Sequence, residues 1–317
     1  MLQRLFQVLC QKVVLRFNSA RHGGVLYFHR VLPFPDPYYP DDLTVNELDT
    51  LLHWLGQAFE FSRLSDMKNP PSGDKPRLGL SFDDGYQDNL RLGVPVLLKH
   101  GVPATFFVAS RGVKEGILWQ DRLIHAIKHA SSARQLHLCR RERIEPTEGC
   151  LLATRLLSIL KRMPHQERDR ATQSICIALD APAFPWLMLT QQDIQTLGND
   201  ESGLFDIGGH TCDHTVLTTE SDTESKRQIV HNKKELESWL GKPITLFCYP
   251  NGAVPTDLTA LHAEMVKEAG YTMAFTSMDG GVGIDSHDYL LPRFLPHRKH
   301  PWLRTLSALK IAGESSL

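Results

Sequence analysis

Short apolar segments that alternate with amphipathic segments constrain the fold of this chain more than any other feature. Segments with a strand pattern cover residues 24–31, 77–82, 104–108, 204–210, 244–249, 271–276 and 289–295. Segments with apolar residues at helical spacing separate most of them, at 44–59, 87–100, 223–240 and 257–269. Strands that alternate with helices are typical of a parallel sheet. The pattern therefore predicts a parallel α/β barrel.

The segment from Trp119 to Leu197 interrupts this alternation. Its apolar residues recur at helical spacing and show no strand pattern; they are Leu123, Ile127, Ala130, Leu152, Leu156, Ile159 and Leu160. We therefore predict a helical insert at about residues 119–197, which could form a cap beside a functional site. Its charged run from Arg140 to Arg143 is most simply a solvated face, and the alternative is contact with an anionic part of a substrate.

Composition narrows the class of protein. The 317 residues carry a formal net charge of −1, and no long basic block indicates binding to nucleic acid. No apolar stretch reaches the length of a transmembrane helix. The six cysteines lack CxxC spacing, which favours reduced thiols in a cytosolic protein over a disulfide framework.

Residues 1–21 have the pattern of an amphipathic helix. Apolar residues recur at helical spacing, with basic residues between them, at Leu2, Leu5, Phe6, Leu9, Val13 and Phe17. Such a helix either packs on the domain or touches a membrane surface. Because no signal peptide is apparent, we expect a cytoplasmic protein, either free or peripheral to the inner membrane. One domain then covers residues 22–300, and 301–317 form a C-terminal tail.

The most informative strand is Arg77–Phe82, which runs directly into Asp83, Asp84 and Gly85. Gly85 allows a sharp turn. Two adjacent carboxylates repel each other unless one binds a cation and leaves the other free to act as a base. For this motif alone, a polar turn is the simpler interpretation.

A second strand, 204–210, ends in His210, and His214 follows four residues later. With Asp84, the two imidazoles would form a metal site of the type that zinc occupies in hydrolytic centres. Two histidines alone are more often structural than metal-binding. Catalytic groups collect at the carboxyl ends of the strands in parallel barrels, and both motifs fall at such ends.

Three motifs together resemble the polysaccharide deacetylases, the NodB-homology or carbohydrate esterase 4 family. They are Ser81–Gly85, His210–His214 and Phe247–Gly252, and the resemblance spans about residues 24–296. It implies a distorted (β/α)7 barrel and metal-assisted amide hydrolysis, with zinc as the expected ion. It also implies that Asp83 is the general base, that Asp84, His210 and His214 bind the metal, and that the Asn251 N–H donates to the oxyanion.

The third motif departs from the family pattern. Many members carry an arginine two residues before the motif's proline, and here that residue is Cys248. Arg293 could orient Asp83 instead, and the alternative is that Arg293 forms a surface ion pair. We interpret Cys248 and Cys212, which flank the site, as small packing residues.

The general acid is a second departure. Many members use a histidine from a late Leu-x-His motif, for which His297 is the candidate here. In the branch that resembles the biofilm poly-N-acetylglucosamine deacetylases, the histidine comes from the first strand. Tyr27–Val31 is similar to that branch, so the resemblance favours His29. The alternative for His29 is a buried, hydrogen-bonded core histidine.

These features predict a metal-dependent hydrolase that removes N-acetyl groups from amino sugars. The expected partner is an N-acetylated glycan, either a polysaccharide, a glycolipid or a lipid-linked glycan precursor. Two alternatives remain open at this point. One is a glycan-binding relative that has lost catalysis, which the change at Cys248 permits. The other is a hydrolase of small amides or cyclic imides.

Overall fold

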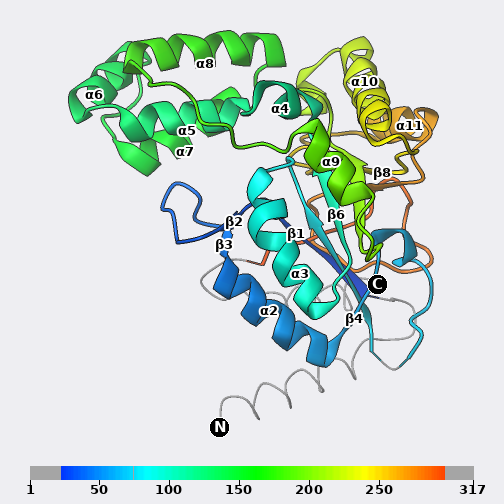
Figure 1. The fold of residues 1–317 in the computed structure, drawn as a ribbon. Coiled ribbons are helices and arrows are strands. Elements are labelled where there is room, and N and C mark those ends of the chain that lie inside the picture. The colour runs from blue at the N-terminus through cyan, green and yellow to red at the C-terminus, as the bar shows by residue number, and fades with distance from the viewer. Residues whose placement is uncertain (1–22, 74, 297–317) are drawn as a thin grey trace.

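A computed structural model describes residues 23–73 and 75–296 (Figure 1). The predicted N-terminal helix at 1–21, the candidate acid His297 and the tail at 301–317 lie outside the described residues. In the part that is described, no helix is long and apolar enough to cross a membrane.

A parallel sheet forms the centre of the molecule. Its main path runs β1 (Gly23–Phe28), β5 (Arg77–Phe82), β6 (Ala104–Val108), β7 (Phe205–Gly209), β8 (Leu246–Cys248) and β9 (Met273–Phe275). A two-residue strand, β4 (Glu60–Phe61), pairs with the beginning of β5 beside this path. Every pairing in the sheet is parallel, which confirms the predicted α/β architecture.

The predicted strand at 289–295 is not a strand in the structure. It makes isolated parallel bridges, Phe275 with Leu291 and Leu26 with Phe294, which connect β9 back to β1. Pro292 separates the two bridges and has no N–H to donate to a continuous ladder. The segment therefore closes the ring of strands without forming regular structure.

Helices cover the outside of the sheet, and all of them lie close to their predicted positions except α9, whose residues belong to the predicted insert. They are α2 (Val45–Ala58), α3 (Val94–His100), α9 (Gln191–Gly198), α10 (Asp222–Leu240) and α11 (Ala260–Glu268), with a π-helical turn at Asn89–Gly93 before α3 (Figure 1). The predicted capping box at the start of α2 is present: the Thr44 side chain accepts from the Glu47 N–H, and Glu47 accepts from the Thr44 N–H.

Helices also fill the segment that interrupts the alternation. After the short α4 (Ser110–Glu115) come α5 (Trp119–His129), α6 (Ser132–Arg141), α7 (Gly149–Leu160) and α8 (His165–Leu179). Helices α5–α8 lie together to one side of the sheet (Figure 1), and we call them the helical insert. They share a core of their own, which includes Leu123, Ile127, Leu138, Leu152, Leu156, Leu160, Ile175 and Leu179. Arg140–Arg143 are all exposed on it, as expected of a solvated face.

The strand ends are held in place by aromatic packing. Phe28, Phe82 and Phe106 are buried and pack in sequence across three strands, with ring centroids 5.5 Å and 5.4 Å apart. Phe28 and Phe82 are the last residues of β1 and β5, so His29 and Asp83 follow directly from a rigid support. Parallel pairing brings both residues to the same edge of the sheet.

Candidate active site

The structure brings the three predicted metal ligands together. Asp84 follows β5, and His210 and His214 follow β7. One oxygen of Asp84, Oδ1, lies 3.3 Å from His210 Nε2 and 3.0 Å from His214 Nε2. Asp84 and His210 are almost completely buried, and His214 is partly buried. The side chains thus converge on one point although Asp84 and His210 are far apart in the sequence.

The chemistry of this cluster fits a bound cation. The other ring nitrogen of His210, Nδ1, lies 2.8 Å from the Cys248 carbonyl oxygen, which can only accept a hydrogen bond. In the neutral imidazole the proton is therefore on Nδ1, and the Nε2 lone pair faces Asp84 Oδ1. That oxygen is itself buried without a hydrogen-bond partner among the described residues. Electron-rich atoms that converge in this way suit a divalent metal ion.

The three side chains differ in how the site shifts their pKa values. Burial alone would raise the pKa of Asp84, but His214 and His210 hold it well below its ordinary value, so Asp84 is an anion. Burial lowers the pKa of His214, which opposes the effect of Asp84 and keeps that imidazole neutral. A carboxylate anion and a neutral imidazole are the forms in which Asp84 and His214 would bind a metal. Despite burial, Cys248 and Asp84 instead raise the pKa of His210 well above its ordinary value, so a cation bound there would have to displace the His210 proton.

The turns that carry the motifs are strained. Among the described non-glycine residues with positive φ are Asp84 (74°), Thr211 (61°), His214 (48°) and Asn251 (60°), all in the three motifs. This left-handed conformation is uncommon outside glycine and persists where the surrounding structure enforces it. At Gly252 (φ 75°) a Cβ atom would lie 2.8 Å from the Ser277 nitrogen, so this turn requires glycine.

Asp83 is held by Arg293. Arg293 Nη1 donates to Asp83 Oδ1 and Nη2 donates to Oδ2, each over 2.8 Å. Arg293 is 1% exposed, so the alternative of a surface ion pair is wrong. Burial would raise the pKa of Asp83, but the Arg293 guanidinium outweighs it and the pKa is lowered. Asp83 is therefore an ionised carboxylate that can accept a proton.

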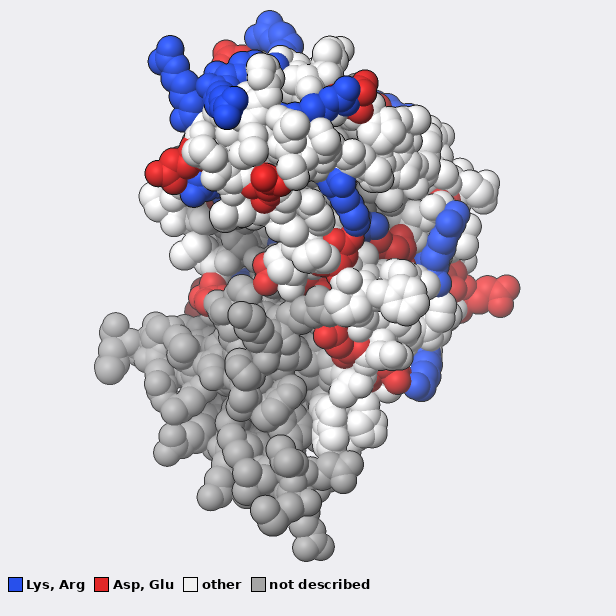
Figure 2. All heavy atoms as spheres, turned by 90° about the vertical axis from the view of Figure 1, so that its left-hand side faces the viewer, with Lys and Arg blue, Asp and Glu red and all other residues white. Residues whose placement is uncertain are grey.

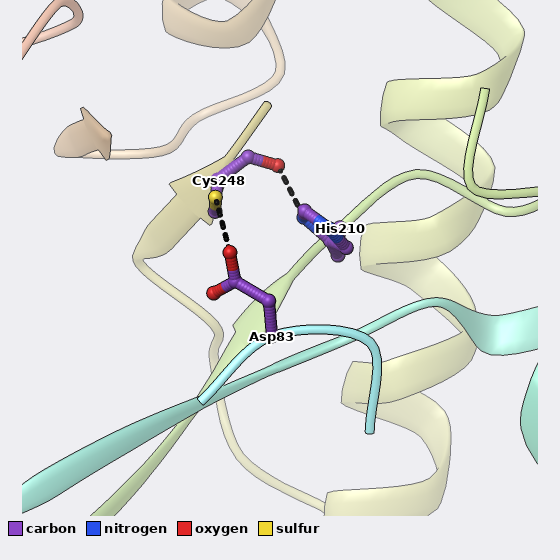
Figure 3. A group of neighbouring side chains, drawn as sticks. All are labelled: Asp83, His210 and Cys248. Atoms are coloured by element: carbon purple, nitrogen blue, oxygen red, sulfur yellow. Dashed lines mark hydrogen bonds between the residues drawn. The ribbon is translucent and has the colours of Figure 1, made fainter. Parts of the chain in front are cut away.

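Cys248 contacts both His210 and Asp83 (Figure 3). Its carbonyl accepts from His210, and its thiol lies 3.6 Å from Asp83 Oδ2. The same sulfur lies 2.7 Å from Arg293 Nη2. Cys248 does more than the packing that we expected of it, because it contacts Asp83, Arg293 and His210. Cys212 is buried and its thiol faces a backbone carbonyl, in agreement with a packing role.

His29 lines the same cavity as Asp84 and His214. The cavity has a volume of about 380 Å³, and its lining includes His29, Asp83, Asp84, His214, Asn251 and Arg293. His29 is only partly buried, and its ring packs edge-on against Tyr27. The alternative of a buried core histidine therefore does not describe it. Its competitor His297 lies outside the described residues, so the choice between them stays a prediction.

Asn251 is exposed in the turn after β8, and it lines the cavity. Its carbonyl accepts from the Ser277 hydroxyl, and Gly252 N–H donates to the Pro250 carbonyl over 2.7 Å. These contacts fix the turn on both sides of Asn251. The backbone N–H of Asn251 has no hydrogen-bond partner among the described residues. It is therefore available to donate to a substrate oxygen.

Sequence reasoning did not identify several residues that complete the site. Gln120, at the start of α5, donates from Nε2 to Asp84 Oδ2 over 3.2 Å. The loop before α2 and the helical insert supply much of the remaining wall, with Tyr38, Tyr39, Asp41, Asp42, Trp119, Ile124, Leu157 and Lys161. The only signals for them were the length of the loop and the interruption by the insert, and neither identifies single residues. Figure 2 shows acidic side chains gathered in the indentation beside the insert.

The comparisons with known proteins agree with this geometry. The family model described as polysaccharide deacetylase matches residues 71–141 and 192–274, which contain all three motifs. The first matched segment runs from the sheet into α5 and α6 of the insert, and the unmatched residues between the two segments include α7 and α8. No curated protein matches the chain.

Several solved structures, among them two described as deacetylases, share the fold. IcaB from Ammonifex degensii is 16% identical with a TM-score of 0.55, over 92% of this chain and 97% of that chain. A de-N-acetylase from Aggregatibacter actinomycetemcomitans is 16% identical with a TM-score of 0.52, over 86% and 94%. The BpsB deacetylase domain from Bordetella bronchiseptica is 14% identical with a TM-score of 0.51, over 86% and 94%.

These likenesses confirm the predicted fold class, a distorted (β/α)7 barrel with a helical insertion. The family indicates a hydrolase that deacetylates a glycan, and its members are generally metal-dependent. The motifs, the arrangement of their side chains and the family model point to one conclusion: this chain belongs to the polysaccharide deacetylase family.

Proposed function

We propose that the protein is a zinc-dependent hydrolase that removes N-acetyl groups from amino sugars. The substrate would be a polysaccharide, a glycolipid or a lipid-linked glycan precursor. One observation carries the proposal: the convergent Asp84, His210 and His214 lie beside an ionised, arginine-held Asp83 in one cavity. A metal site next to a separate base is the arrangement that metal-assisted amide hydrolysis requires.

Each residue of the proposed site would have its own role in the reaction. A divalent cation at Asp84, His210 and His214 would lower the pKa of water and polarise the N-acetyl carbonyl. Asp83 would take a proton from the attacking water, with Arg293 holding the carboxylate ionised and correctly oriented. The Asn251 N–H would donate to the carbonyl oxygen as it gains negative charge. His29 would give a proton to the sugar nitrogen as the C–N bond breaks, which releases acetate and a free amine.

The walls of the cavity support a sugar as the substrate. Tyr38, Tyr39 and Trp119 line it, and aromatic rings with polar edges suit the mixed apolar and hydroxyl faces of a pyranose. Many family members carry an arginine at the position of Cys248, and here Arg293 supplies the guanidinium beside Asp83 instead. This argues against a relative that has lost catalysis.

The proposal is tested by acetate release from a panel of N-acetylated glycans and glycolipids, with and without a chelator. We expect release from at least one amino-sugar substrate, its loss with chelator and its recovery on addition of Zn²⁺. The Asp83→Asn variant is the negative control for contaminating activity. Binding of a glycan without any acetate release by the metal-loaded protein would instead favour the impaired relative. Release from small amides or cyclic imides alone would favour the third alternative.

A further inference from the structure

The proposed metal ligands differ in the hydrogen bonds that orient their side chains. The His210 ring is fixed through Nδ1 by the Cys248 carbonyl, and Asp84 Oδ2 accepts from Gln120. His214 Nδ1 is buried and has no hydrogen-bond partner among the described residues. Metal-binding imidazoles usually donate their second N–H to an acceptor that fixes the ring. His214 must therefore be positioned by other means.

The backbone at His214 also requires support. Its φ is 48°, and Thr211 in the same turn has a φ of 61°. Non-glycine residues keep such conformations only where contacts from outside over-determine them. A contact that fixes the peptide groups on either side of His214 would meet both requirements.

Arg168 makes this contact. From α8 of the helical insert, its Nη1 donates to the His214 carbonyl over 3.0 Å, and its Nη2 donates to the Asp213 carbonyl over 2.9 Å. A guanidinium is a rigid planar group, so these two bonds fix the orientation of two consecutive peptide groups. A more flexible donor such as lysine could hold only one of them well.

Arg168 is itself held firmly. It is 2% exposed, and its guanidinium lies 4.8 Å from the centre of the Trp119 ring. Asp169 Oδ1 accepts from Nη2 and Nε of Arg168 over 3.2 Å and 3.3 Å. The beginning of α8 is anchored as well, because the His165 N–H donates to Glu220 over 2.6 Å. The side chain that contacts the backbone at His214 is therefore fixed in position.

We propose that Arg168 is a positioning residue for the metal ligand His214, so that the helical insert forms part of the metal site as well as a wall of the cavity. This inference rests on the proposed metal site. Arg168 lies in α8, between the two segments that the family model matches.

The test compares metal dissociation constants. Zn²⁺ and Co²⁺ are titrated against a chromophoric chelator for the full chain and for Arg168→Met, Arg168→Lys and Arg170→Met. Arg170 is exposed on the same helix and serves as the matched control. We expect Arg168→Met to weaken binding by about 10–100-fold, the usual effect of losing an outer-shell partner of a metal ligand. Arg168→Lys should weaken it by less, Arg170→Met should leave it unchanged, and the Co²⁺ absorption bands of Arg168→Met should shift.

A purely structural role would lower the unfolding temperature of the metal-free protein without changing the dissociation constant. Folded Arg168→Met with the original dissociation constant and Co²⁺ spectrum would therefore overturn the inference. If Arg168→Met does not fold, Arg168→Lys decides: weaker binding supports the inference and unchanged binding overturns it. Failure of the unsubstituted protein to bind either metal would overturn the proposed function itself. The titration of the unsubstituted protein comes first, so this outcome is distinguished from any effect of the variants.

Discussion

Arg293 and Asp83 form two parallel hydrogen bonds of 2.8 Å in a fully buried pair, although 210 residues separate them in the sequence. The pair keeps a carboxylate ionised in a place where burial would otherwise favour its neutral form. The same guanidinium also contacts Ser81, because Arg293 Nη1 donates to the Ser81 hydroxyl over 2.8 Å. Arg293 thereby connects the base to the strand that carries it.

Replacing Arg293 by methionine should raise the pKa of Asp83. Because the folded-state pKa is lowered by Arg293, its loss leaves burial uncompensated, and Asp83 becomes protonated at higher pH than before. The acidic limb of the profile of kcat/KM against pH should move upward by about 1–3 units. Arg63→Met is the control, since Arg63 Nη1 donates to both carboxylate oxygens of Asp206 in a partly exposed position. An unmoved acidic limb would show that Asp83 is not the titrating base.

Purified protein should contain about one divalent ion per chain. Asp84→Ala, His210→Ala and His214→Ala should each lose it on dialysis, because each removes one of only three protein ligands. Metal content is measured by elemental analysis alongside circular dichroism, which confirms the fold. Full occupancy in all three variants would contradict the assignment of the ligands.

Asp83→Asn should separate the base from the metal site. The amide keeps the shape of the side chain but cannot accept the proton, so turnover should fall by about 10²–10⁴-fold. Metal content should stay near that of the unsubstituted protein, since the three convergent ligands do not include Asp83. If the variant loses the metal as readily as Asp84→Asn does, the roles of the two aspartates have to be exchanged.

His29→Ala tests the general acid. We expect kcat to fall by about 10²–10⁴-fold with metal content and fold intact, and the alkaline limb of the rate profile to flatten. His297→Ala is the matched comparison and should have a mild effect. The opposite result, with His297 essential and His29 dispensable, would assign the acid to the late Leu-x-His position.

Cys248→Arg tests whether Arg293 replaces the arginine that many family members carry at this position. Cys248 is fully buried and its sulfur is 2.7 Å from Arg293 Nη2, so a second guanidinium would lack both space and a carboxylate of its own. The free energy of unfolding, measured with urea, should fall by about 3–5 kcal/mol, as for an uncompensated buried charge. Cys248→Ser should cost much less. Undiminished stability of the arginine variant would show that the two positions can exchange this role.

Sequence periodicity was sufficient for most of the barrel. The strand at residues 104–108 and the helix that begins near residue 222 lie almost where apolar spacing places them. The motif residues could be identified too, because each follows a buried strand and the polar residues at strand ends are constrained to one edge of the sheet. These features depend on interactions between near neighbours, which leave a local pattern.

The remaining features depended on tertiary structure. The strand Glu60–Phe61 is too short to show alternation, and Pro292 reduces the predicted strand at 289–295 to two bridges. Gln120 and Arg168 donate hydrogen bonds to the proposed metal ligands Asp84 and His214, which lie 36 and 46 residues away in the sequence. Arg293 reaches Asp83 only because the segment after β9 closes the ring against β1. The sequence by itself determined which residues could carry the chemistry. Packing across long sequence separations decided which side chains hold them, because such contacts have no local periodicity to reveal them.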